Sequence, residues 1–360
     1  MRRERVRLTP LAGSARKALP ILLAAALLAA PGVAGATNSG GKWDNLDGDP
    51  WYVGNGGGSN GNITINEPTL YASGGLIKST SVNDVTLSNN TVTVLAGADG
   101  DSVYGATIDC YVPGTVTMEG NRVFIKGGNY NSVEGALVTH YTIYQNTPIL
   151  KDNHVVIEGG SFNDMTTIAG AGGWTNAQSD LTTATGNSLT INAGTFGYGY
   201  DFYGAWLRNS RSTSVNGNSV TITGGTSASD VMISGGSVIR ITFDDEESTP
   251  GHFTANDNVV DLGNVTLDDV RISGGGISIS SDDSGSATGN KVILREGLTL
   301  TGNSYLYGGY SDSTGNANLD VRTGNTLEVR TFGLTATNVR SVRTAPCQPG
   351  FMRFVPRGTA

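Results

Sequence analysis

The chain has 360 residues, of which 52 are glycine and only 15% are charged, and its formal net charge is −8. The glycines follow no three-residue period, which excludes a collagen triple helix, and two cysteines, Cys110 and Cys347, are too few for a disulfide framework. The negative charge also disfavours nucleic acids and anionic membranes as partners, because it repels phosphates.

The first 36 residues are predicted to be an export signal. A basic front ends at Lys17, an apolar run follows from Ala18 to Ala30, and Ala34-Gly35-Ala36 matches a small-x-small cleavage site. The alternative is a membrane anchor, but the run is shorter than the roughly 20 residues that span a bilayer. Removing residues 1–36 takes away six of the 23 basic and one of the 31 acidic side chains, so the mature chain carries about −13.

A glycine-rich segment, residues 37–61, follows the signal. It contains Trp43 and Trp51 and is predicted to be an N-terminal cap. A stack of strands needs such a cap, because an uncovered first edge pairs with other chains.

Residues 62–332 contain an internal repeat. Its motif is an asparagine followed by aliphatic residues two and four positions later, and successive asparagines are 31 to 40 residues apart. The aliphatic residues share one face of a short strand, and stacking the next copy above it buries that face. The eight repeat asparagines are Asn90, Asn121, Asn153, Asn187, Asn218, Asn258, Asn290 and Asn325.

A second landmark, a pair of small residues such as Gly135-Ala136 or Gly274-Gly275, follows each of the first seven asparagines by 14 to 18 positions. A looser copy of both landmarks lies around Asn62 and Gly74-Gly75, with its aliphatic residues Ile63 and Ile65 one position out of phase with Asn62. The pairs are expected at a corner where a Cβ would clash or φ is positive. The asparagines are expected at a turn, stacked into a ladder of side-chain amides.

These features predict an all-β chain folded as a parallel β-helix (β-solenoid) of about eight to nine repeats of roughly 32 residues. A repeat of that length holds roughly three short strands, and the sequence leaves open whether it makes one coil or part of one. A β-sandwich or propeller is the alternative fold, although only two strand signals are clear in each unit. The longest spacing includes 244–251, interpreted as an exposed acidic loop.

The Asn-x-Val-x-Ile units behind an export signal resemble the passenger regions of Gram-negative autotransporters. The resemblance covers about residues 62–332 and implies a parallel β-helix carried outward by a C-terminal outer-membrane barrel. In that family many passengers serve adhesion or self-association, and others carry protease or lyase sites. No series of alternating strands typical of such a barrel follows Val329.

Residues 333–360 form an atypical basic tail with several arginines, prolines and Cys347. From about residue 340 onward we interpret this tail as the product of a frameshift or a premature stop in a longer gene. The alternative is a genuine short tail. An intact gene would place the protein at the cell surface or outer membrane, and the chain as it stands would be periplasmic or secreted.

Residues that could carry chemistry are sparse. His140, His154 and His252 have no cysteine or carboxylate at metal-ligand spacing, and the acidic residues 244–247 and 282–283 are interpreted as solvated loops. No nucleophile elbow, catalytic triad or phosphate loop is present. We therefore expect no catalytic residue, no metal and no cofactor.

The aromatic segment from Tyr198 to Trp206 is the densest in the chain and could stack on sugar rings. Its candidate residues are Tyr198, Tyr200, Phe202, Tyr203 and Trp206. Outside this segment Trp43, Trp51 and Trp174 could stack in the same way, although Trp43 and Trp51 are predicted to belong to the cap. We expect an exported structural or adhesive β-solenoid whose partners are cell-surface glycans or proteins, or further copies of itself. The alternatives are a β-helix polysaccharide lyase or hydrolase acting on extracellular glycans and, from isolated Thr-x-Thr pairs, an ice-binding solenoid.

Overall fold

The computed structural model describes residues 52–56, 59–77, 84–108, 114–138, 147–164, 167–175, 182–209, 212–225, 228–240, 250–279, 283–313, 318–320, 323–330, 335–336, 340–344 and 352–353. The predicted export signal, most of the predicted cap, both cysteines, His140 and the acidic residues 244–247 lie outside these ranges.

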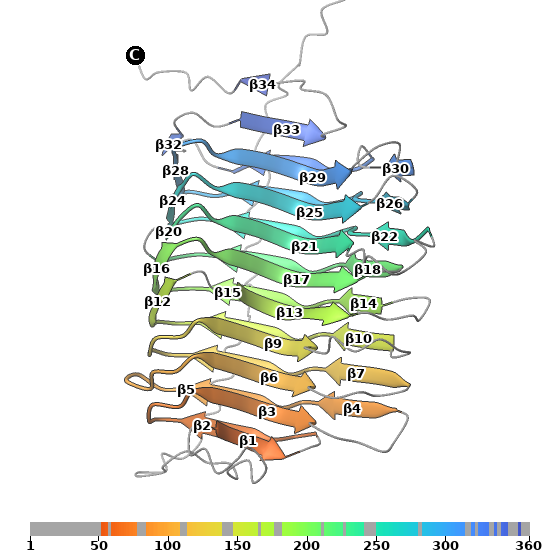
Figure 1. Cartoon of the computed structure of the whole chain (residues 1–360). Helices are drawn as coiled ribbons and strands as arrows, with labels where there is room; N and C mark the ends of the chain where they lie inside the picture. The colour runs from red at the N-terminus through yellow and green to blue at the C-terminus, as the bar shows by residue number, and fades with distance from the viewer. Residues whose placement is uncertain are drawn as a thin grey trace, which may run out of the picture. The chain divides into compact units, whose positions relative to one another are not determined.

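The described residues form a parallel β-solenoid without helices, as the repeat predicts (Figure 1). Strands one repeat apart lie side by side in register. For example, β11 (His154–Ile157) pairs with β8 (Arg122–Ile125) so that His154 is opposite Arg122, 32 positions earlier. Each repeat is therefore one full coil.

The strands belong to four sheets within the described ranges. The long sheet contains β1 (Tyr52–Gly56), β3 (Tyr71–Ile77), β6 (Ser102–Ile108), β9 (Ser132–Val138), β13 (Thr167–Thr175), β17 (Asp201–Asn209), β21 (Met232–Arg240), β25 (Arg271–Ile279), β29 (Tyr305–Ser313), β33 (Arg340–Thr344) and β34 (Met352–Arg353). The asparagine sheet contains β2 (Asn62–Ile65), β5 (Thr91–Val94), β8, β11, β15 (Ser188–Ile191), β19 (Ser219–Ile222), β23 (Val259–Leu262), β27 (Lys291–Leu294) and β31 (Thr326–Val329).

Two sheets of short strands complete the coil. One contains β4 (Val85–Ser88), β7 (Thr115–Glu119), β10 (Thr147–Lys151), β14 (Thr182–Thr185), β18 (Thr213–Asn216), β22 (His252–Thr254), β26 (Ser284–Ser286) and β30 (Asn318–Asp320). The other contains β12 (Ser161–Asp164), β16 (Thr195–Tyr198), β20 (Ala228–Ser229), β24 (Thr266–Asp268), β28 (Thr299–Thr301) and β32 (Thr335–Ala336). Coils from β9 onward therefore have four strands rather than the predicted three.

The repeat asparagines from Asn90 to Asn290 form a ladder of side-chain amides, and Asn290 donates to Asn325 Oδ1 through its backbone nitrogen. Asn187 Nδ2 donates to Asn218 Oδ1 at 3.0 Å and to the Leu150 carbonyl of the preceding coil at 2.9 Å, while its Oδ1 accepts from the side-chain and backbone nitrogens of Asn153. Asn187 is fully buried. A buried amide is tolerated here because each of its polar groups has a partner.

The ladder packs directly against the glycines of the long sheet. A Cβ built on Gly135 would lie 3.2 Å from the Asn153 Cβ and 3.0 Å from the His154 nitrogen. The sequence predicted either a clash with a Cβ or a positive φ at the small-residue pairs. Gly135 does not have a positive φ, so the clash explains why glycine recurs at this position. The row of glycines is not an outer corner. It lies where the repeat asparagine of each coil packs against the middle of a strand of the long sheet, and we call this narrow part of the coil the waist.

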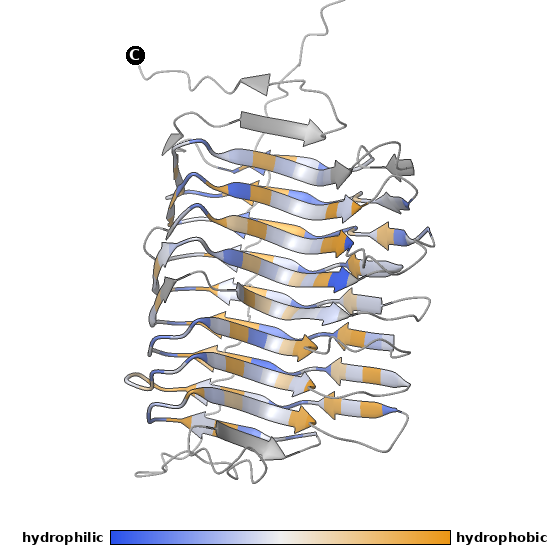
Figure 2. Cartoon of the chain, in the orientation of Figure 1, coloured by the Kyte–Doolittle hydropathy of each residue, from blue (hydrophilic) through white to orange (hydrophobic). Residues whose placement is uncertain are grey.

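The waist separates two hydrophobic cores along the solenoid. Val133, before the glycine, packs with Val155 and Ile157 of the asparagine sheet. Ala136 and Val138, after it, pack with residues of the β10 sheet. Figure 2 shows hydrophobic residues recurring at equivalent places on successive strands. Each large aliphatic side chain fully buried this way stabilises the fold by about 1.5–3 kcal/mol.

The first and last repeats differ from the sequence interpretation. Ile63 and Ile65 lie opposite Val92 and Val94, so their phase is not shifted. It is the asparagine that is missing, because Gly61 takes that place and its nitrogen donates to Asn90 Oδ1 at 2.7 Å. At the other end, β32 and β33 extend two sheets beyond residue 332, where the repeats were predicted to stop. Backbone pairing continues there although the side-chain motif has ended.

Candidate functional site

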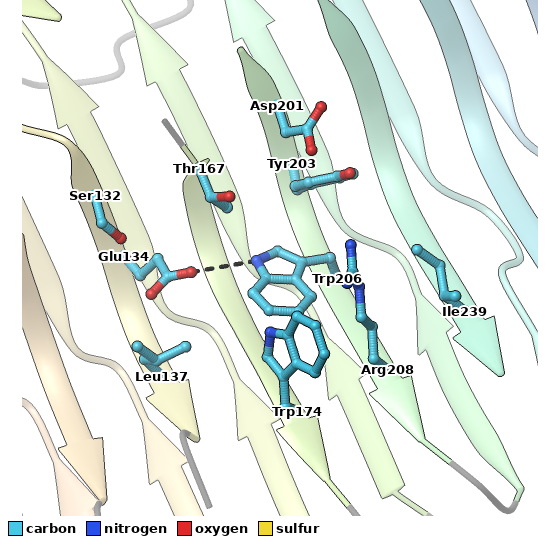
Figure 3. Close-up of a pocket in the computed structure, with 10 residues that line it drawn as sticks. All are labelled: Ser132, Glu134, Leu137, Thr167, Trp174, Asp201, Tyr203, Trp206, Arg208 and Ile239. Carbon is cyan, nitrogen blue, oxygen red and sulfur yellow. Dashed lines mark hydrogen bonds between the residues drawn. The ribbon is translucent and has the colours of Figure 1, made fainter. Parts of the chain in front are cut away.

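A pocket of about 320 Å³ opens on the outer face of the long sheet (Figure 3). It is formed by β9, β13, β17 and the following strand β21. The lining residues are Ser132, Glu134, Leu137, Thr167, Trp174, Asp201, Tyr203, Trp206, Arg208 and Ile239.

The bend of the long strands at their small-residue pairs determines which side chains face outward. In β9 Val133 and Ala136 point into the two cores, so Glu134 and Leu137 point away from them. The strand register places Glu134, Ala169 and Tyr203 in one outer row. In β13, between Glu134 and Tyr203, the outer row therefore holds only the small Ala169.

Trp206 lies across this gap. A Cβ on Gly172 would meet Cε2 of the Trp206 indole at 2.5 Å, so only glycine leaves room for the ring over β13. The indole reaches Glu134 two strands away, and its Nε1 donates to Glu134 Oε1 at 3.2 Å (Figure 3). The gap in β13 is thus the reason that residues 72 positions apart meet.

Glu134 is 1% exposed. Desolvation by burial raises the pKa of its carboxyl from 4.5 to about 8, although the hydrogen bond from Trp206 lowers it in part. Its second oxygen, Oε2, is buried and has no hydrogen-bond partner within the described part of the chain. A neutral carboxylic acid with one oxygen unused therefore lines the pocket at pH 7.

The opposite wall combines aromatic and charged groups. The Arg208 guanidinium carbon lies 4.3 Å above the Trp174 ring, and the two indoles of Trp174 and Trp206 meet edge to face at 6.3 Å. Tyr203 forms a hydrogen bond with Asp201. Burial raises the pKa of the Asp201 carboxyl, and the hydrogen bond with Tyr203 and the charge of Arg208 lower it in part. Arg208 Nε is buried and has no hydrogen-bond partner among the described residues.

The raised pKa of Glu134 predicts a stability that falls with pH. The unfolded chain loses the Glu134 proton near pH 4.5 and the folded chain only near pH 8, so the contribution is complete below pH 4.5 and lost by pH 8. The loss reaches at most about 1.4 kcal/mol per pH unit. Urea unfolding at pH 5 and pH 9 should show a larger drop for the wild type than for Glu134→Gln. Equal drops would mean that Glu134 ionises as freely in the folded chain as in the unfolded one.

The structure separates the aromatic residues singled out from the sequence. Tyr203 and Trp206 line the pocket. Tyr200 and Phe202 are buried in the core, where no ligand reaches them, and Tyr198 is 62% exposed on β16, away from the pocket. Alternation along β17 explains the split, because Phe202 and Tyr203 point to opposite faces.

Trp174, a further aromatic candidate from the sequence, also lines the pocket. The charged pocket residues Glu134, Asp201 and Arg208 were not identified from sequence. They lie on two different coils, and no local motif links them. One signal was available for Glu134, the only charged residue of β9, whose other residues are apolar or small.

Asp283, which was interpreted as part of a solvated loop, is buried. It forms an ion pair with Arg240 and accepts a hydrogen bond from the Gly251 nitrogen at 2.9 Å. His154 and His252 each contact a serine of the next coil through Nδ1, at 2.7 and 3.0 Å. Within the described ranges no three His, Cys, Asp or Glu side chains cluster as metal ligands, and no helix could span a membrane.

No protein-family model, curated protein or solved structure matches this chain. The geometry of the pocket is therefore the basis for assigning a function.

Proposed function

We propose that the protein is an exported, adhesive β-solenoid that binds a glycan in the pocket on the outer face of its long sheet. The observation that carries the proposal is the pocket wall, where two indoles and a tyrosine lie beside the polar groups of Glu134 and Arg208. Sugar rings present apolar C–H faces and hydroxyl edges, and the pocket offers both aromatic surface and buried polar atoms.

Export and the surface role rest on other features. The basic and apolar start of the sequence supports export, and the resemblance of the repeats to autotransporter passengers supports presentation at the cell surface. The solenoid fold is compatible with this role, because its hydrogen-bonded sheets hold the pocket residues on rigid strands. The proposal includes no catalytic step.

Calorimetric titration of the purified chain with a panel of oligosaccharides tests the binding site. We expect at least one sugar to bind, and Trp174→Ala to weaken binding about tenfold, since stacking and packing against an indole contribute about 1–2 kcal/mol. Tyr198→Ala is the matched control, because it removes an exposed aromatic ring from outside the pocket. The proposal fails if no sugar binds, or if the two variants behave alike.

A second candidate is favoured by one observation, the presence of two carboxyl groups, Glu134 and Asp201, in a single pocket. Glycoside hydrolases use a protonated acid together with a carboxylate base or nucleophile, and Glu134 is protonated at neutral pH. Prolonged incubation with the bound oligosaccharide distinguishes the two. New reducing ends that disappear in Glu134→Gln would indicate a hydrolase, and an intact sugar supports binding alone.

A further inference from the structure

Two side-chain atoms of residues that line the pocket have no hydrogen-bond partner in the described part of the chain. They are Glu134 Oε2 and Arg208 Nε, and both are fully buried. Buried polar groups are nearly always hydrogen-bonded. Two buried polar atoms without partners in residues of one pocket therefore point to a bound group that forms hydrogen bonds with them.

Both atoms are hydrogen-bond donors at neutral pH. Arg208 Nε can only donate. Glu134 carries its proton, and its Oε1 already accepts from Trp206, which leaves Oε2 to donate. Among the other polar lining residues, Tyr203 and Asp201 hydrogen-bond each other, and Ser132 and Thr167 carry hydroxyls that can donate or accept. The ligand must therefore present acceptors without donors at this point, and a carboxylate is the common sugar substituent of that kind.

We propose that the pocket is selective for a hexuronate, a sugar ring that carries a carboxylate, with Arg208 and Glu134 donating to that carboxylate and the indoles packing on the ring. This inference rests on the proposed glycan binding and specifies its ligand. The charge of Arg208 compensates the carboxylate, and the neutral Glu134 donates without repelling it.

The overall negative charge of the chain does not oppose a single carboxylate strongly. At physiological salt, charges more than about 8 Å apart are largely screened. The charged groups near Glu134 therefore determine how favourably a carboxylate is bound there. The titratable groups near Glu134 are Tyr104 on β6 and Asp201, Tyr203 and Arg208 on β17. The described outward residues of β13 contain no titratable group.

Calorimetric titrations with trigalacturonate, its trimethyl ester and a neutral galactose trisaccharide test the selectivity. We expect trigalacturonate to bind about tenfold to a hundredfold more tightly than the ester, the range for hydrogen bonds to a charged group. Acetate, a carboxylate without a ring, should not bind measurably. Equal binding of the acid, the ester and the neutral sugar would overturn the uronate assignment while leaving glycan binding intact. Binding of none of the three, with another sugar of the panel bound, would overturn the uronate assignment alone, and only the absence of binding across the whole panel would remove both.

Two variants test the residues. Arg208→Gln should remove the preference for trigalacturonate over its ester, whereas Arg122→Gln, which changes an exposed arginine on the asparagine sheet, should preserve it. Wild-type affinity for trigalacturonate should fall about tenfold from pH 7 to pH 9 as Glu134 ionises. Glu134→Gln keeps an uncharged donor and should bind equally at both pH values. If the variant follows the same pH profile as the wild type, Glu134 does not contact the carboxylate.

Discussion

Replacing Gly274 by alanine is expected to lower the free energy of unfolding by about 3 kcal/mol or more, as overpacking a rigid site does. The added Cβ would lie 2.7 Å from the Lys291 nitrogen, 2.9 Å from the Asn290 Cβ and 2.5 Å from the Gly308 carbonyl oxygen. Two of these three atoms belong to the backbones of neighbouring strands, so no side-chain rotation can relieve the clash. Urea unfolding followed by far-UV circular dichroism measures the change.

Gly276 provides the matched control two residues along the same strand. A Cβ there would meet Tyr310 Cδ1 at 3.5 Å, an ordinary contact, and it would point to the outer face. Gly276→Ala should therefore be neutral or stabilising by about 0.5 kcal/mol, since it reduces the entropy of the unfolded chain. If both variants lost stability equally, the cause would be strand propensity rather than the waist.

The second large effect is expected for Asn187→Ala. The substitution removes the side-chain partner of the Leu150 carbonyl and of the Asn153 backbone nitrogen. Asn218 Oδ1 and Asn153 Nδ2 each lose one hydrogen bond but keep another, to the Asn187 backbone nitrogen and to the Met118 carbonyl. Each buried polar group left unsatisfied costs about 1–3 kcal/mol, so a loss on the order of 4 kcal/mol is expected for the variant. Because most contacts of a coil are with its immediate neighbours, unfolding should also split into two transitions.

Asn192→Ala is the control for the ladder. Asn192 lies in the same coil, but it is exposed and accepts only from the Thr223 hydroxyl in its side-chain contacts. Its removal should change stability by less than about 0.5 kcal/mol. A single unfolding transition for Asn187→Ala, with the wild-type midpoint, would show that the ladder does not link the coils.

The stacking of the coils could be predicted because the repeat is written along the chain. The pattern of Asn153, Val155 and Ile157 recurs with the same internal spacing in the eight repeats from Asn90 to Asn325, and this identifies both the strand and the face that it buries. The waist could not be predicted, because it depends on Gly135 and Asn153 meeting across the interior. The number of strands in a coil was also missed, since short strands such as β20 have no hydrophobic pattern of their own.

The pocket residues also divide into those that the sequence identified and those that it did not. Sequence identified Tyr203 and Trp206 as aromatic candidates but could not separate them from Phe202, which points into the core. Glu134 was not identified because its one local signal, a charge in a strand of apolar and small residues, does not indicate a pocket. Its environment is created by Trp206, which arrives from two coils away across Gly172.

The amino-acid sequence by itself determined the all-β solenoid and the face of each repeat strand that is buried. These properties depend on the period of hydrophobic residues, and period is a property of the chain alone. The tertiary structure alone decided the contact of the asparagine ladder with the glycine row and the assembly of the pocket. Those depend on which side chains of different coils share one outer row, and the register that aligns β9, β13 and β17 exists only once the coils have stacked.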